Sequence, residues 1–250
     1  MRIRGILIVL FFPLLLNAQD NETCKDNEPP ADYNDPMEAI KARAIKIAQD
    51  RYVRLEAQSI LEEDSDEPFS ATAVRVGCRL LISNFHALQA HFVTREPVAA
   101  IGPVEKERLA EISVKGLTSP RDLIAIESET AVAGLPPIKF AEKVSPGEVV
   151  LNWSNANGRN GFLKFYYVAR GEKNGFILLD RPAIPGESGF GLFNLKGELV
   201  GIVSANIQRG DDNDEEPPQR FYGMVIAANT VKAFLRAMDE DVGALNECKK

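Results

Sequence analysis

The chain has 250 residues, of which 45% are hydrophobic and 26% are charged, and its formal net charge at pH 7 is −7. This composition is typical of a globular protein and excludes an intrinsically disordered or membrane-embedded chain. The acidic balance, without a basic stripe, argues against nucleic acid or an anionic membrane as a partner.

Residues 1–18 have the pattern of a signal peptide. A basic start with two arginines precedes a short apolar run over residues 5–16, and Ala18 gives a small residue at a typical cleavage point. The apolar run is shorter than the roughly 20 residues that a transmembrane helix needs. We therefore expect an exported protein, periplasmic or secreted, with no membrane contact after cleavage. Loss of the two arginines takes the formal charge of the mature chain to −9.

Residues 19–67 are predicted to form a polar leader followed by one amphipathic helix. Pro36 stands at a helix start after Asp35, and apolar residues recur at helical spacing as far as Leu55. We expect this helix to end near Glu62, where an acidic run begins that we interpret as a solvated linker.

The sequence predicts short strands over residues 69–226. Stretches rich in Val, Ile, Leu and aromatic residues alternate with clusters of Gly, Pro, Asn and Ser, without helices between them. This pattern is typical of all-β barrels or sandwiches. Two prolines at 136–137 mark a seam between a first lobe over residues 68–135 and a second over residues 136–250. The second lobe is expected to contain a helix over residues 227–238.

The three cysteines leave one over if a disulfide forms. We expect Cys24 to pair with Cys248, because they lie near the two ends of the chain. Closing so long a loop would contribute roughly 5 kcal/mol to stability. Cys78 lies in an apolar, strand-like run and is expected to be a buried small apolar residue. The cysteines and histidines are not spaced as in a zinc site. The acidic run at 211–216 lacks the ligand spacing of a calcium loop, so we predict no metal and no cofactor.

Two segments offer an imidazole base and an acid to orient it. An apolar strand over residues 80–83 leads to His86 at a turn, and the only other histidine of the chain is His91. Asp122 opens a second apolar strand, residues 122–126, where a carboxylate would be drawn inward. Taken alone, such a histidine is more often a surface or core residue, and such an aspartate more often caps a turn.

A third segment offers a nucleophile. Residues 184–191 place Ser188 between glycines, which permit a tight backbone loop. In such a loop the N–H groups of Gly186 and Ser188 could point at one spot beside the hydroxyl, as an oxyanion site requires. Taken alone, the segment also fits an ordinary glycine-rich hairpin loop.

Together these segments resemble three blocks of the trypsin-like serine peptidases, most closely those of the HtrA-like bacterial branch. Ser-Asn-Phe-His, ending at His86, resembles the family's Thr-Asn-x-His, and Asp-Leu-Ile-Ala-Ile, starting at Asp122, resembles Asp-Leu-Ala-Val-Leu. Residues 180–189 are similar to Asp-Ala-Ala-Ile-Asn-Pro-Gly-Asn-Ser-Gly, which contains the nucleophile. The resemblance covers about residues 69–238. It implies an all-β fold of two six-stranded antiparallel barrels with the site in the cleft between them.

The resemblance also assigns a role to each residue of these blocks. It implies that His86 is the general base, Asp122 the orienting acid and Ser188 the nucleophile. The backbone N–H groups of Gly186 and Ser188 would form the oxyanion hole. Ser204 would lie near the acid and line the substrate cleft.

The primary pocket is predicted from the same resemblance. The residue six before the nucleophile, an aspartate in trypsins that cleave after Lys or Arg, is Pro182 here. The pocket should therefore be small and apolar, with cleavage after Val, Ala, Ile or Leu. The residues expected to bind substrate are Pro182, Ala183, Ser204, Ala205, Asn206 and Met224.

Two positions differ from the family pattern. Phe190 stands where the family usually has the second glycine of Ser-Gly-Gly. Glu187 stands where Asp or Asn is usual, and in digestive trypsins an acid there pairs with a newly cut N-terminus.

We expect no PDZ domain after the terminal helix, although HtrA relatives usually carry one.

The leading hypothesis is an exported serine endopeptidase that cleaves protein or peptide substrates through an acyl-enzyme. One alternative is a catalytically impaired relative that binds peptides or partner proteins in the cleft. Another is a structural exported β protein whose motif matches arise by chance. The order His, Asp, Ser and the lack of strand–helix alternation exclude an α/β-hydrolase, in which the serine comes first. The sequence does not indicate an oligomeric state.

Overall fold

The protein is described from a computed structural model, which covers residues 36–57, 69–94, 98–101, 108–128, 131–132, 135–154, 162–184, 186–209, 220–238 and 240. The predicted signal peptide, the polar leader, the Cys24–Cys248 pair and the acidic run at 211–216 lie outside these residues. None of the helices within them has the length and apolar character needed to cross a membrane.

Six antiparallel strands form a first closed barrel, in the order β1-β2-β3-β6-β5-β4. They are β1 (Tyr52–Ala57), β2 (Phe69–Arg75), β3 (Leu80–Ser83), β4 (Val98–Ile101), β5 (Arg108–Thr118) and β6 (Leu123–Ser128). Strand β6 is apolar without alternation because both of its faces are covered. Ile124 and Ile126 pack in the interior of this barrel, whereas Leu123 and Ala125 pack in a core shared with the second set of strands.

The second six strands are antiparallel as well, in the order β10-β11-β12-β9-β8-β7. They are β7 (Val149–Ser154), β8 (Phe162–Lys173), β9 (Phe176–Leu179), β10 (Gly191–Asn194), β11 (Leu199–Arg209) and β12 (Arg220–Ala227). Strands β10 and β7 pair over two residues, Phe193 with Leu151 and Asn194 with Val150. The coarse prediction of a mostly β fold with a six-stranded antiparallel barrel and helices near both ends is confirmed.

The N-terminal helix is shorter than the sequence predicts. Helix α1 (Pro36–Arg51) ends at Arg51, and the next six residues form β1, which pairs with both β2 and β4. The expectation of a helix running to about Glu62, and of a first lobe starting at residue 68, is therefore wrong. Val53 and Leu55 are buried in the first barrel at the two-residue spacing of a strand. The helical spacing that extended to Leu55 was coincidental.

A helix that the sequence analysis did not predict follows β3. Helix α2 (Phe85–Thr94) begins immediately after Ser83-Asn84, where only a turn was expected. It packs Phe85 and Leu88, one helical turn apart, against the core of the first barrel. His86 consequently lies on the first turn of a helix, which fixes the direction of its backbone N–H.

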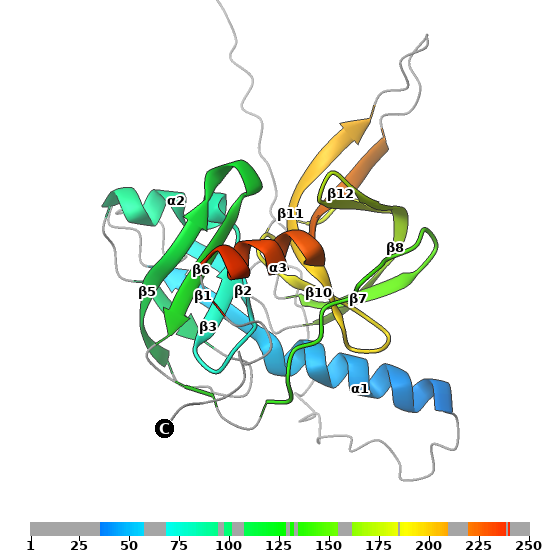
Figure 1. The fold of residues 1–250 in the computed structure, drawn as a ribbon, viewed down its shortest axis with the longest axis horizontal. Helices are drawn as coiled ribbons and strands as arrows, with labels where there is room; N and C mark the ends of the chain where they lie inside the picture. Colours follow the sequence, from blue (N-terminus) through cyan, green and yellow to red (C-terminus); the bar gives the residue numbers. More distant parts are fainter. Residues whose placement is uncertain are drawn as a thin grey trace, which may run out of the picture. The chain divides into compact units, whose positions relative to one another are not determined.

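One shared apolar core joins the two sets of strands. Helix α3 (Ala228–Ala237), red in Figure 1, buries Val231 and Leu235 and contacts β6 on one side and β11 and β12 on the other. Helix α1 contributes Ala44 and Ala48 to the same core and contacts β7 and β10. Pro136, where the sequence predicts a seam, lies between β6 and β7, and its carbonyl accepts a hydrogen bond from the Arg51 guanidinium. These contacts hold the two halves of the candidate site in register.

Cys78 differs from its prediction. It is half-buried rather than buried. It lies in the turn between β2 and β3, where its carbonyl accepts a hydrogen bond of 2.9 Å from Arg75 Nη1. A position in a turn explains why the side chain does not pack inside the barrel.

Candidate active site

Strand pairing in the first barrel brings the predicted base and acid together. Strands β3 and β6 pair with Ser83 opposite Ile124, so the segments that flank this end of the pair meet. The Asp122 carbonyl accepts hydrogen bonds from the Phe85 N–H, at 3.2 Å, and from Asn84 Nδ2, at 3.1 Å. These bonds place the Asp122 side chain beside the first turn of α2.

The imidazole and the carboxylate form two hydrogen bonds. His86 Nδ1 lies 2.7 Å from Asp122 Oδ2, and the His86 backbone N–H donates to Asp122 Oδ1 at 2.9 Å. Asp122 follows the short helix η1 (Ser119–Arg121) and has a left-handed backbone conformation, φ 53° and ψ 39°. Aspartate tolerates this conformation better than most residues. The pair orients the ring with Nδ1 toward the acid, which leaves Nε2 available to accept a proton from another group.

The electrostatics of this pair favour a charged imidazole next to a charged carboxylate. The hydrogen bond to Asp122 raises the pKa of His86 above its usual value of 6.5, although partial burial acts in the opposite direction. Burial by itself would raise the pKa of Asp122, but the hydrogen bonds from the His86 ring, the Ser204 hydroxyl and the His86 backbone N–H outweigh it and lower that pKa.

Ser204, on β11, links the acid to the predicted nucleophile. Its hydroxyl donates to Asp122 Oδ2 at 2.6 Å, and its carbonyl accepts a hydrogen bond of 3.1 Å from Ser188 Oγ. Among the described residues, no hydrogen bond joins the side chains of Ser188 and His86. Catalytic hydrogen bonds are often long or misaligned without substrate and tighten in the complex.

The loop that carries Ser188 leaves two N–H groups available. Gly186 and Gly189 both have positive φ values, 89° and 90°, which glycine adopts without strain. The Glu187 and Phe190 N–H groups are used within the loop, and the Gly189 N–H donates to the Val203 carbonyl. By contrast, the N–H groups of Gly186 and Ser188 donate to no other group in the described part of the chain. These are the two predicted oxyanion donors.

Phe190 packs in an apolar core next to the nucleophile loop. Its side chain is buried, and its ring stacks on that of Tyr52 with centroids 5.6 Å apart. Tyr52 is the first residue of β1, the strand that the sequence analysis assigned to a helix. The aromatic residue two positions after Ser188 therefore has its packing partner in β1.

The residues predicted to line the primary pocket lie on three neighbouring segments. Asn206 Oδ1 accepts from the Ala183 N–H, and Asn206 Nδ2 donates to the Ala183 carbonyl, both at 2.7 Å. Ala205 pairs with Met224 across β11 and β12. The Gly223 N–H donates to the Arg181 carbonyl, which holds the segment with Pro182 against β12. These contacts hold the segment with Pro182 and Ala183, strand β11 and strand β12 side by side.

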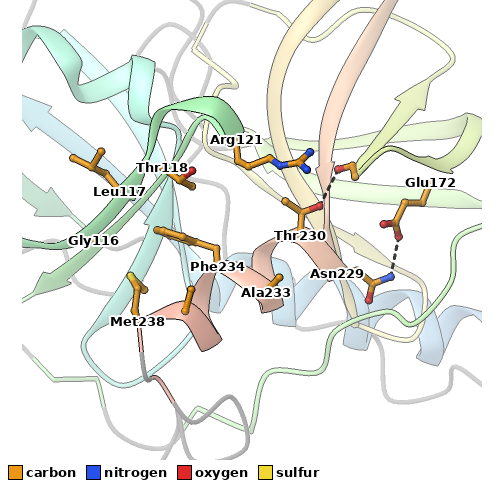
Figure 2. Close-up of a pocket in the computed structure, with 12 residues that line it drawn as sticks. Gly116, Leu117, Thr118, Arg121, Glu172, Asn229, Thr230, Ala233, Phe234 and Met238 are labelled. Carbon is orange, nitrogen blue, oxygen red and sulfur yellow. Dashed lines mark hydrogen bonds between the residues drawn. The ribbon is translucent and has the colours of Figure 1, made fainter.

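A separate cavity of about 550 Å³ is lined by residues of β5 and of helix α3 (Figure 2). Leu117, Phe234 and Met238 form its apolar side, and Arg121 lies at its polar end, where Nη1 donates to the Asn174 carbonyl at 3.1 Å. Arg121 directly precedes Asp122, but none of the three predicted catalytic residues lines this cavity. It is therefore distinct from the candidate active site.

His86 is the imidazole that the structure brings to the acid, and the side chain of the other histidine, His91, lies outside the described residues. Across the described ranges, no three His, Cys, Asp or Glu side chains gather closely enough to hold a metal ion.

No protein-family model and no curated protein matches the sequence. Among solved structures, the chain is similar to the crystal structure of a serine endoprotease from Yersinia pestis, with a TM-score of 0.61 and 18% sequence identity. The similarity covers 79% of this chain and 66% of that protein, so the chain spans slightly less than two thirds of its length. The chain shares the fold of a serine endoprotease.

Proposed function

We propose that this chain is a serine endopeptidase whose catalytic triad is His86, Asp122 and Ser188. One observation carries the proposal. A continuous set of hydrogen bonds runs from His86 through Asp122 and Ser204 to Ser188, across the boundary between the two sets of strands. The fold shared with a serine endoprotease supports the same conclusion.

In the proposed reaction His86 Nε2 takes the proton of the Ser188 hydroxyl as the oxygen attacks the substrate carbonyl. The N–H groups of Gly186 and Ser188 bind the oxyanion that forms. His86 then gives the proton to the leaving amine, so the peptide bond breaks and an acyl-enzyme remains. A water molecule then attacks the acyl-enzyme, with His86 again as the base, and releases the second product. Asp122 stays ionised throughout and stabilises the imidazolium.

We further propose that cleavage follows small apolar residues such as Val, Ala, Ile or Leu. The aspartate that would select a basic side chain is replaced by Pro182. The two hydrogen bonds between Asn206 and Ala183 draw the facing segments together, which supports a narrow pocket. The proposed site of action is outside the cytoplasm, on the evidence of the signal-peptide pattern in residues 1–18.

The test is digestion of an unstructured protein by the purified chain, with the cut positions mapped by mass spectrometry. A serine endopeptidase of this kind cuts mainly after Val, Ala, Ile and Leu, and the variant Ser188→Ala cuts nowhere. A profile dominated by Lys or Arg would contradict the proposed specificity.

The alternative function is peptide binding by a catalytically impaired relative. The hydrogen bond that directs Ser188 Oγ to the Ser204 carbonyl instead of His86 favours it. This alternative predicts no cleavage by the wild type but retention of apolar peptides. Equal product formation by wild type and Ser188→Ala would contradict the endopeptidase proposal.

A further inference from the structure

Glu187, the residue directly before the proposed nucleophile, has a fully buried carboxylate. Lys164 Nζ lies 3.1 Å from each carboxylate oxygen. The Tyr166 hydroxyl donates to Oε2 at 2.6 Å, and the Ile184 N–H donates to the same oxygen at 2.8 Å. A buried carboxylate is costly unless it is both paired and hydrogen-bonded, and Glu187 meets both conditions.

The cation of this network comes from β8. Lys164 and Tyr166 are two residues apart on the strand and therefore point to the same face, toward Glu187. The ammonium group lies 4.7 Å from the centroid of the Tyr166 ring, and only 16% of the Lys164 side chain is exposed. Arg181 lies near the same ring, but it forms an ion pair with Asp180 at 3.6 Å. Within the described residues, Lys164 is the cation that contacts the Glu187 carboxylate.

Tyr166 acts in this network as a donor only. Burial and the nearby Glu187 carboxylate raise the pKa of its hydroxyl far above the usual value of 10, so the group stays protonated. Its O–H therefore donates to the carboxylate and cannot supply the positive charge that the carboxylate requires.

The network sets the conformation of the nucleophile loop. The Ile184 N–H donates to the Glu187 carboxylate, while the Glu187 backbone N–H donates to the Ile184 carbonyl at 3.1 Å. These two bonds close the turn over residues 184–187. They direct the Gly186 and Ser188 N–H groups away from internal partners. An oxyanion hole depends on this placement, because its donors must be preorganised.

We propose that Lys164 is a positioning residue for the proposed reaction: as an internal counter-ion it fixes the Glu187 carboxylate and, through it, the oxyanion loop. The inference rests on the proposed function. In digestive trypsins the partner of an acid at this position is a newly cut N-terminus. Here the partner belongs to β8 of the same fold, so the loop takes its competent form in the uncut chain.

The test compares three variants with the wild type. Lys164→Met removes the charge and keeps most of the apolar stem, and Lys164→Arg keeps the charge. Lys173→Met changes another lysine of β8, one whose exposed side chain makes no hydrogen bond or ion pair with the described residues. For each protein, kcat and KM on an apolar peptide substrate, the rate of labelling by a fluorophosphonate and the thermal midpoint are measured.

Lys164→Met is expected to lower kcat about 100-fold, because small displacements of catalytic groups have effects of this size. KM should change by less than about threefold, since the donors act mainly on the transition state. Lys164→Arg should recover most of kcat, and Lys173→Met should match the wild type. If Lys164→Met does not fold, Lys164→Gln, which keeps a hydrogen-bond donor but no charge, is expected to give the same loss of kcat.

Folded Lys164→Met or Lys164→Gln with kcat within about threefold of the wild type would overturn the inference and leave the proposed function intact. A loss confined to KM would overturn it as well, because it would show a role in ground-state binding. A different result would contradict the proposed function itself. In that case the folded wild type neither reacts with the fluorophosphonate nor cleaves peptides.

Discussion

The Ser204 hydroxyl donates a hydrogen bond of 2.6 Å to Asp122 Oδ2, and so connects β11 in the second set of strands to the carboxylate that follows η1 in the first barrel. The carbonyl of the same residue accepts from Ser188 Oγ. Ser204 is itself buried, whereas its two partners are partly exposed. One residue therefore fixes the position of the acid and of the nucleophile at once.

Replacing Ser204 by Ala should lower kcat/KM about tenfold. The lost hydrogen bond is made to a charged group, and such bonds contribute about 1.5–3 kcal/mol. Loss of this donor should also raise the pKa of Asp122, since the hydroxyl is among the groups that lower it. Steady-state kinetics measure the effect, with Ser113→Ala, at an exposed serine of β5, as the control. An unchanged kcat/KM would show that Ser204 does not support the acid.

The pH dependence of kcat/KM should follow the titration of His86. The imidazole must be neutral to accept the Ser188 proton, so activity rises with pH through the pKa of His86. That pKa is raised above 6.5, chiefly by the hydrogen bond to Asp122, and the midpoint should lie above 6.5. Asp122→Asn removes this cause, so the midpoint should move down while kcat falls by about 10⁴. A wild-type midpoint at or below 6.5 would contradict the geometry of the pair.

Gly189→Ala should destabilise the protein more than Gly147→Ala. Both glycines have positive φ, 90° and 82°, and the conformational cost of alanine there is about 1–2 kcal/mol. At Gly189 a Cβ would in addition lie 1.9 Å from the Thr72 carbonyl oxygen, whereas at Gly147 it would meet nothing within 4 Å. An additional loss of about 2 kcal/mol would lower the thermal midpoint by a further 4–8 °C or so. Equal midpoints for the two variants would show that β2 does not approach the nucleophile loop so closely.

Asn206→Ala should widen the substrate preference. The variant loses both hydrogen bonds to Ala183, so the two segments are no longer tied together and larger apolar side chains should be accepted. The cleavage profile of a peptide library, measured by mass spectrometry, should extend to Phe and Met. Asn229→Ala, at an exposed asparagine of α3, is the matched control. A cleavage profile identical to that of the wild type would show that the Asn206–Ala183 hydrogen bonds do not limit the size of the side chains accepted.

The contact between His86 and Asp122 was more predictable from the sequence than the edges of the fold. His86, Asp122 and Ser188 lie in short local motifs, and strands β3 and β6 carry two of them to one place by a simple pairing. The strand β1 was missed because Val53 and Leu55 also fit the helical spacing of the preceding residues. A two-residue and a near-four-residue period cannot be told apart over so few positions.

The contact partners of Glu187 and Phe190 could not be predicted, because they lie far away in the sequence. Glu187 was recognisable as a departure from the family pattern, but its partner Lys164 lies 23 residues earlier on another strand. Phe190 pairs with Tyr52, far away in the sequence and on a strand that was not expected. Such contacts depend on the closure of the sheets, which local patterns do not encode. The alternation of Lys164 and Tyr166 on β8 was the available signal that a lysine points inward.

The central claim is that Ser188 is an activated nucleophile, and covalent labelling tests it most directly. The purified wild type and the variants Ser188→Ala and His86→Ala are treated with a fluorophosphonate, and the modified residue is identified by mass spectrometry. We predict a single adduct on Ser188 in the wild type, no adduct in Ser188→Ala and a greatly slowed reaction in His86→Ala. A folded wild type that remains unmodified, or that is modified equally in all three proteins, would contradict the account.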